Sequence, residues 1–229
     1  MTERTRTIAV VTAGLSQPSS TRMLADRLAE ATSARLTEKG IPTEVRIFEL
    51  RDVALDVMNN MLTGFPSPKL DAVIEAVTGA DGLIAVTPIF TTSASGLFKS
   101  FFDVIDNRSL TDMPTVIAAT AGTARHSLAL DYAIRPMFTY LHAVVATTAV
   151  FAAAEDWGSG ADTVKTLPDR IDRAAGELAA LIAASDRSRL RARPVHDRRI
   201  LQPDRWLPAL DLTRSLREWG NARTHRSPR

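Results

Sequence analysis

Short apolar runs that alternate with helix-length amphipathic segments constrain the fold of this chain more than any other sequence feature. The runs have strand length and are rich in β-branched residues; they are 7–12, 44–48, 82–87, 114–120 and 144–150. The helix-length segments are 21–39, 67–77, 95–104, 127–140 and 164–185. This alternation is typical of a parallel sheet with right-handed crossovers and helices on both faces. The sequence therefore predicts a doubly wound α/β fold.

The charge distribution divides the chain near residue 185. Residues 186–229 hold twelve Arg and no Lys against five acidic residues, a net charge of +7, whereas residues 1–185 carry a net charge of −5. We therefore predict one domain over 1–185 and a basic C-terminal extension over 186–229. One interpretation of the extension is an oligomerisation arm that packs on a neighbouring subunit or on the rim of a site. The other is an Arg-rich segment that binds nucleic acid or another anionic surface. No aromatic residue interrupts the Arg run, so we favour the arm and do not expect nucleic acid.

Composition also restricts the compartment and the chemistry. No apolar run approaches the ~18 residues of a membrane span, and the N-terminus lacks the apolar region of a secretory signal. The absence of cysteine excludes disulfides, thiolate catalysis and cysteine metal sites. We therefore expect a cytoplasmic protein without membrane contact.

The loop after the first predicted strand is rich in hydroxyl groups. It reads TAGLSQPSSTRML over 12–24, and its candidate ligand residues are Ser16, Ser19, Ser20 and Thr21. Hydroxyl and free N–H groups at a helix N-terminus bind anions, and the helix dipole favours them. Ordinary N-capping is the alternative, but one cap needs only one hydroxyl. The loop therefore favours a phosphate group.

The loop after the third predicted strand continues this pattern. It reads VTPIFTTSASG over 86–96, and its candidate ligand residues are Pro88, Ile89, Phe90, Thr91, Thr92 and Ser93. Small polar groups beside an apolar surface suit the edge of a flat heteroaromatic ring. The alternative is a Ser/Thr-rich turn that ends in Ser95 as a helix N-cap.

A third loop, TAGTARHSLALDY over 120–132, follows the fourth predicted strand. Gly122 and Thr123 form its small-residue turn, and His126 lies just beyond. This histidine could hydrogen-bond a cofactor or substrate, or could be structural. Ligands of doubly wound sheets bind beyond the carboxyl ends of the strands, where all three loops lie.

Three segments carry a resemblance to a known family. TPIFTTSASGLFKSFFD resembles a segment of the flavodoxin-like NAD(P)H-dependent FMN reductases, and GLSQPSSTRMLA is similar to their phosphate loop. ATAGTARHSLALDYAIRPMF resembles the third loop and the following helix of the branch that supplies reduced flavin to two-component monooxygenases. Together the matches cover about 1–185, in the order and spacing of the family.

The resemblance implies a flavodoxin-like five-stranded sheet of order 2-1-3-4-5, FMN at the carboxyl ends of the strands, and a homodimer or homotetramer. By motif position it implies that Ser16, Ser19 and Thr21 hold the phosphate, that 88 and 90–93 line the isoalloxazine and ribityl chain, and that 122–123 face the other side of the flavin. The sequence departs from the family at Ser16, where many members have Arg, and at Phe90, where Tyr is common.

The implied function is hydride transfer from NADH or NADPH to FMN, with reduced flavin passed to a partner monooxygenase. FMN would carry the redox chemistry, so we expect no catalytic side chain and no metal. The alternatives are a quinone or azo reductase with tightly bound FMN, a flavodoxin-like electron carrier without nicotinamide turnover, and a non-catalytic binding protein.

The segment 95–106 is apolar on more than one face, which indicates either a deeply buried helix or an interface. Because the resemblance implies a dimer around the flavin, we favour the interface.

Overall fold

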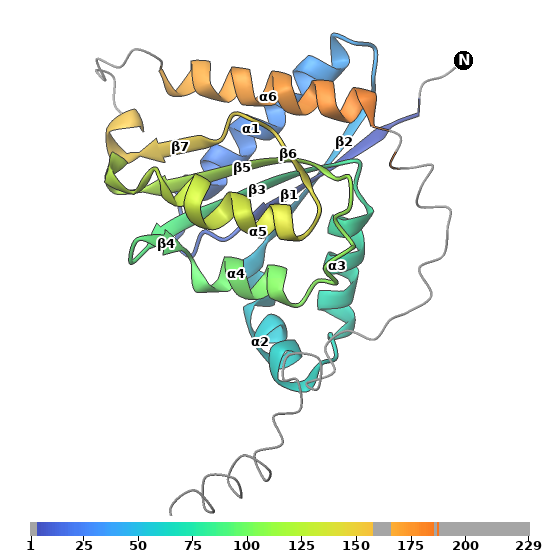
Figure 1. The fold of residues 1–229 in the computed structure, drawn as a ribbon, viewed down its shortest axis with the longest axis vertical. Helices are drawn as coiled ribbons and strands as arrows, with labels where there is room; N and C mark the ends of the chain where they lie inside the picture. Colours follow the sequence, from blue (N-terminus) through green and yellow to red (C-terminus); the bar gives the residue numbers. More distant parts are fainter. Residues whose placement is uncertain (1–3, 158–165, 186, 188–229) are drawn as a thin grey trace, which may run out of the picture.

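The computed structural model describes residues 4–157, 166–185 and 187, and they form a helix–sheet–helix domain (Figure 1). The strands in these residues are β1 Arg6–Thr12, β2 Thr43–Glu49, β3 Gly82–Phe90, β4 Ser93–Ala94, β5 Pro114–Ala121, β6 Val144–Val145 and β7 Val150–Ala153. The α-helices are α1 Ser20–Thr37, α2 Ala54–Thr63, α3 Pro68–Gly79, α4 Gly96–Asp103, α5 Arg135–Tyr140 and α6 Leu167–Ala184.

The parallel sheet has the order β2-β1-β3-β5-β6, and β7 also pairs with β5. The predicted fifth strand is thus divided into β6 and β7, which occupy the same sheet position one after the other. Counted by position, the order is the expected 2-1-3-4-5, and the flavodoxin-like fold is confirmed. Strand β4 was not predicted; it forms an antiparallel hairpin with the end of β3.

Helices cover both faces of the sheet, as Figure 1 shows: α1 and α6 lie on one face, and α3, α4 and α5 lie on the other. Alternate residues of β1 divide between the two cores. Ile8 and Val10 pack with the α1–α6 cluster, whereas Ala9 and Val11 pack with the cluster beneath α3, α4 and α5. Each face therefore has its own apolar core, as a doubly wound sheet requires.

Helix α2 and the 3₁₀ turn Leu50–Val53 before it were not predicted. Its N-cap residue, Val53, makes no side-chain capping hydrogen bond. Its C-cap residue, Gly64, has the left-handed conformation. It buries only Val57 and Asn60, so its apolar residues do not mark a core-facing stripe. Figure 1 shows α2 beyond α3 and α4, at the end of the domain remote from α1 and α6.

The single helix predicted over 127–140 is wrong in detail. The structure has a 3₁₀ turn at Ala124–His126, a π-helical turn at Leu130–Ile134 and only then α5. In the π turn the N–H of Arg135 donates to the carbonyl of Leu130, five residues earlier. Pro136 then stands in the first turn of α5, where a missing N–H is tolerated.

Helix α4 is held by its own subunit. Phe98, Phe101 and Phe102 are buried and meet Phe138 of α5 in an edge-to-face aromatic cluster. Val104 and Ile105 are buried as well. The interface that we favoured for 95–106 is therefore wrong for these side chains, and the alternative of a deeply buried helix is correct.

The described chain ends at Arg187, whose buried guanidinium donates to the carbonyls of Thr78, Ala80, Ser109 and Thr111. The remainder of the basic extension, 188–229, lies outside the described residues. The predicted helix start at 164 also lies outside them, and α6 begins at Leu167. Within the described residues, no helix combines the length and hydropathy needed to span a membrane.

Candidate functional site

The register of the sheet brings the three loops to one edge. Thr12 at the end of β1 pairs with Val86 of β3, and Pro88 of β3 pairs with Thr120 of β5. The carboxyl ends of these three strands are therefore adjacent, and each leads directly into one of the candidate loops. This adjacency meets the geometric requirement for a ligand site in a doubly wound sheet.

The first loop ends in a capped helix. Ser19 is nearly buried, and its hydroxyl accepts from the N–H of Arg22 at 3.2 Å as the N-cap of α1. Gly14 makes this close turn possible, because a Cβ there would lie 2.0 Å from Ser19 Oγ. Ser16 and Ser20 remain exposed. The 18-residue α1 thus directs its positive dipole end at a loop with free hydroxyls.

A hydrogen bond joins the first loop to the third. The hydroxyls of Thr21 and Thr120 lie 2.8 Å apart and are both buried. Close by in the sheet, the buried Thr12 Oγ1 has no hydrogen-bond partner among the described residues. An unpartnered buried hydroxyl at the carboxyl end of a strand is available to a ligand or an ordered water.

Two arginines, Arg22 and Arg51, lie beside the first loop. The contacts that they make there were not predicted from the sequence. Glu49 at the end of β2 accepts from Arg22 at 2.6 Å and pairs with Arg51 at 2.7 Å. Arg51 also donates to the carbonyl of Ser16 at 3.4 Å and to the side-chain oxygen of Gln17 at 2.9 Å. An arginine from another element thus lies beside Ser16, the position at which many members of the family have Arg.

Carboxylates stabilise the charge of Arg22. Its hydrogen bond to Asp26, at 2.8 Å, is the chief reason that the pKa of Arg22 is raised, and Glu49 adds to the effect. Nothing in the spacing of the sequence marks Arg51, because it follows β2, whose loop was not among the three candidates. Only the neighbouring positions of β2 and β1 bring Arg51 to the phosphate loop.

The second loop is a two-residue hairpin turn with strained backbone. Thr91 and Thr92 both have positive φ, 48° and 71°, between the paired residues Phe90 and Ser93. This is the type I′ pattern, which normally takes Asn and Gly, and β-branched residues rarely adopt it. Strain of this kind costs on the order of 1–3 kcal/mol per residue and is concentrated at functional sites.

Hydrogen bonds behind this turn hold it in place. Thr87 Oγ1 donates to the carbonyl of Pro88 at 2.9 Å and accepts from the N–H of Ser95 at 3.1 Å. Ser95 in turn caps α4, with its hydroxyl accepting from Phe98 N–H. Pro88 and Ile89 are buried, whereas 90–93 are exposed. Of the predicted residues in this loop, the last four are therefore those whose side chains face solvent.

The third loop presents an open glycine and a short capped turn. Nothing lies within 4 Å of a Cβ built on Gly122. Thr123 caps the 3₁₀ turn with its hydroxyl, which accepts from Arg125 N–H at 3.4 Å. His126 is half-buried in that turn. Gly122 thus leaves the flank of the site accessible to a flat group.

Each loop region also exposes large apolar side chains: Leu15 and Met23 in the first, Phe90 in the second, and Leu128 and Tyr132 in the third. Apolar surface at the carboxyl edge suits a planar aromatic ligand, which loses contact with water when it packs against such side chains. The hydroxyl and N–H groups of the first loop can bind an anion at one end of this edge, and the apolar side chains can bind a ring at the other.

These residues fit FMN. Exposed hydroxyls and the α1 dipole suit the phosphate, the buried Thr12 hydroxyl without a partner leaves a polar group to satisfy, and Gly122 leaves room for the ring. The strained turn at Thr91–Thr92 places small polar groups beside Phe90.

The segment Glu155, Asp156 and Trp157 is structural. Asp156 accepts from Ala153 N–H at 2.8 Å and forms an ion pair with Arg170 of α6. Trp157 packs under the guanidinium of Arg27, 5.0 Å from the ring centre. These contacts account for Asp156 and Trp157 without a ligand, and Glu155 is exposed.

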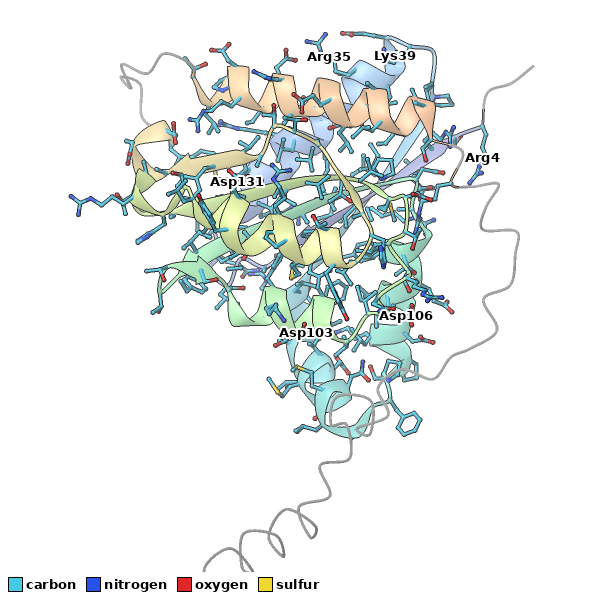
Figure 2. The ribbon with its side chains drawn as sticks, in the orientation of Figure 1. Arg4, Arg35, Lys39, Asp103, Asp106 and Asp131 are labelled. Atoms are coloured by element: carbon cyan, nitrogen blue, oxygen red, sulfur yellow. The ribbon has the colours of Figure 1, made fainter. Side chains whose placement is uncertain are left out.

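A hollow lies between α1 and α6, at the end of α1 opposite to the first loop. Figure 2 shows two of its side chains, Arg35 and Lys39, at the outer side of α6. Arg35 pairs with Asp172 at 2.6 Å and with Glu38 at 3.2 Å, and hydrogen bonding to Asp172 is the chief reason that its pKa is raised. Because its charges pair with one another and it lies far from the three loops, we assign the ligand site to the loops.

Comparison with known proteins agrees with this geometry. The sequence model of the family described as NADPH-dependent FMN reductase matches residues 6–158. An "FMN reductase (NADPH)" of Pseudomonas aeruginosa is 33% identical over 176 residues, which are 76% of this chain and 91% of the relative. The "NADH-dependent FMN reductase SfnF" of Pseudomonas fluorescens is 33% identical over 174 residues, 76% of this chain and 90% of the relative.

Solved structures show the same similarity. An oxidoreductase from Corynebacterium diphtheriae is 49% identical, with a TM-score of 0.76 over 80% of this chain and 99% of that one. The apo form of an NADH:FMN oxidoreductase, EmoB, has a TM-score of 0.67 over 81% of this chain and 94% of that one; at 24% identity it supports the fold alone.

Proposed function

The chain belongs to the NADPH-dependent FMN reductase family, and we propose that its three carboxyl-edge loops bind FMN and align it with a reduced nicotinamide. It is an enzyme, an NAD(P)H-dependent FMN reductase. The observation that carries the proposed site is the 2.8 Å contact of Thr21 with Thr120, because it joins the phosphate loop directly to the third loop. A ligand that touches one loop is then within reach of the other.

The phosphate end of the site is the first loop. Ser16, Ser20 and the N–H groups of the first turn of α1 would bind the phosphate, while Ser19 and Thr21 hold the turn through their own hydrogen bonds. Arg51 would add positive charge beside Ser16. Its pairing with Glu49 keeps the guanidinium oriented when no phosphate is bound.

The ring end of the site is the second and third loops. Phe90, Thr91, Thr92 and Ser93 would line one side of the isoalloxazine, supported from within by the buried Pro88 and Ile89. Gly122, Thr123 and His126 would lie on the other side. The half-buried position of His126 favours a hydrogen bond to the ligand over a charge contact in the open.

FMN supplies the redox chemistry by accepting a hydride from NADH or NADPH. The protein's residues bind and orient: the loops hold the phosphate, fix the ring edge against backbone groups and exclude water from one face. No side chain is assigned to proton transfer.

We further propose that reduced flavin passes to a partner flavin-dependent monooxygenase, and that the protein works as a homodimer or homotetramer. The resemblance of 119–138 to the third loop and following helix of the monooxygenase-supplying branch supports the first proposal. We also infer that 1–185 is the catalytic domain and 186–229 a separate extension, because the sign of the charge changes at that boundary.

The deciding experiment is NAD(P)H oxidation by protein stripped of flavin, with free FMN titrated from zero. A rate that saturates at micromolar FMN is expected. Bound FMN without NAD(P)H oxidation would instead identify an electron carrier, and quinone reduction that does not depend on added FMN would identify a quinone reductase. NADH and NADPH compared side by side give the nicotinamide preference.

A further inference from the structure

Helix α2 presents an apolar stripe to solvent. Leu55, Met58, Leu62 and Phe65 are 81%, 50%, 80% and 79% exposed. Their spacing of three and four residues places the first three on one side of the helix, and Phe65 follows the left-handed Gly64 that ends it. We call these four residues the α2 stripe. Figure 2 shows side chains of α2 projecting away from the sheet and the other helices.

The inner side of α2 holds the helix only weakly. It buries Val57 and Asn60, and neither the amide nitrogen nor the oxygen of Asn60 has a hydrogen-bond partner among the described residues. A buried amide without partners costs stability, so α2 has little to hold it beyond one apolar contact region. A helix with a poor inner face and an apolar outer face gains most from a partner on the outer face.

The C-terminal extension contains a matching stripe. Ala209, Leu212, Leu216 and Trp219 have the same three, four, three spacing as the α2 stripe. Pro208 and Gly220 bracket them as helix start and stop signals. Two helices with apolar residues at alternating intervals of three and four pack along a common seam.

We propose that residues 206–219 of the same chain dock on the α2 stripe. Charge supports this occupant. Residues 52–66, which contain the stripe, carry Asp52 and Asp56 and no basic residue, whereas 186–229 have a net charge of +7. The basic extension is therefore attracted to this acidic end of a domain whose own net charge is −5.

Arg187 is the last described residue before the extension. Its guanidinium binds the carbonyls of Thr78 and Ala80, where α3 ends, so the extension starts beside the helix that follows α2 in the chain. Eighteen residues lie between Arg187 and Trp206. They reach up to about 60 Å when extended, well beyond the radius of gyration of about 16 Å expected for a domain of this size.

Tryptophan fluorescence tests the docking in the full-length protein. The chain has three Trp, of which Trp206 and Trp219 lie in the extension, so Trp157→Phe leaves only these two. We expect blue-shifted emission and acrylamide quenching about twofold weaker than that of a solvated indole, because docked rings are shielded from water. Leu62→Lys, at an exposed position, is expected to restore solvated emission and full quenching. Val45→Lys, an exposed apolar residue on β2, is the matched control and is expected to change neither.

Cross-linking identifies the occupant independently of the spectra. The chain has no cysteine, so Leu62→Cys with Leu216→Cys introduces a single possible disulfide within one chain. Rapid oxidation to a species with monomer mobility on a non-reducing gel is expected. A cross-linked dimer would overturn docking within one chain. A change of oligomeric state in Leu62→Lys with unaltered Trp emission would overturn it in favour of a second copy on the stripe, and solvated Trp emission in the parent would overturn it outright.

Discussion

The hydroxyl groups of Thr21 and Thr120 lie 2.8 Å apart, which joins the start of α1 to the end of β5 across the sheet edge. Both side chains are buried, so each hydroxyl depends on the other for its hydrogen bond. Removing one leaves a buried polar group without a partner, whereas removing both leaves two apolar groups of similar shape.

Thr21→Val is therefore expected to destabilise the protein by about 1–3 kcal/mol, with weaker FMN binding as the first loop loosens. Urea unfolding and titration of FMN fluorescence measure the two effects. The double variant with Thr120→Val should lose less stability than the sum of the single variants. Additive losses would show that the two hydroxyls do not act as a pair.

The Thr91–Thr92 turn offers a test that separates stability from binding. Replacing both residues, as Thr91→Asn with Thr92→Gly, supplies the sequence that a type I′ turn favours, so we expect the protein to gain about 1–2 kcal/mol. If the threonine hydroxyls contact the flavin, the KM for FMN rises in the same variant. Reduced stability would contradict the assignment of strain to these positive φ angles of 48° and 71°.

Gly14 is predicted to be required for its small size. An added Cβ would lie 2.0 Å from Ser19 Oγ, so Gly14→Ala should displace the α1 cap and weaken FMN binding at least about tenfold. Gly176→Ala in α6 is the matched control, because nothing lies within 4 Å of its added Cβ. The control should stabilise the helix by about 1 kcal/mol and leave FMN binding unchanged. Equal FMN affinity in both variants would argue against a role for the first loop in phosphate binding.

Sequence periodicity was sufficient for the framework of the fold. The buried runs of β1, β3 and β5 are nearly continuous in apolar residues, and their order follows from the fold that such runs form. The site loops could be found in the same way, since each follows one of these strands. Periodicity could not reveal α2, whose apolar stripe faces outward, nor the π turn that precedes Pro136.

Contacts between elements were equally out of reach of the sequence. Arg51 is one charged residue among many until strand pairing sets β2 beside β1 and brings its guanidinium to Ser16. The burial of α4 likewise depends on Phe138, forty residues after Phe98, meeting the same aromatic cluster. Such relationships are set by packing, which a single sequence does not display.

Glu177 gives the stability of the protein a defined pH dependence. Burial alone would raise the pKa of its carboxyl group, but hydrogen bonds from the N–H and hydroxyl of Thr148, at 2.7 and 2.6 Å, and from Arg173 outweigh burial and lower it. A lowered folded-state pKa means that the carboxylate contributes stability above its ordinary pKa of about 4.5 and loses that contribution as the pH falls through the folded value.

Glu177→Gln is therefore expected to lower the free energy of unfolding at pH 7 and to approach the parent protein only as the pH falls below 4.5 and through the lowered folded-state pKa. Urea unfolding across this range measures the difference. Glu30→Gln changes an exposed residue of α1 that forms no ion pair with the residues the structure describes; it serves as the control and should show little difference at any pH. A constant difference between Glu177→Gln and the parent would exclude the carboxylate charge as its source.

Arg51 is predicted to act on the flavin phosphate from outside the first loop. Arg51→Ala removes its contacts with Ser16 and Gln17 and the positive charge beside them, so the KM for FMN should rise about tenfold while kcat at saturating FMN changes little. Arg46→Ala, within β2, is the matched control. Among the described residues Arg46 forms an ion pair only with Glu44, and it lies away from the first loop. Riboflavin lacks the phosphate. Its KM should therefore differ between the parent and Arg51→Ala far less than the KM for FMN does. An equal loss with both flavins would show that Arg51 supports the loop structurally and does not neutralise the phosphate.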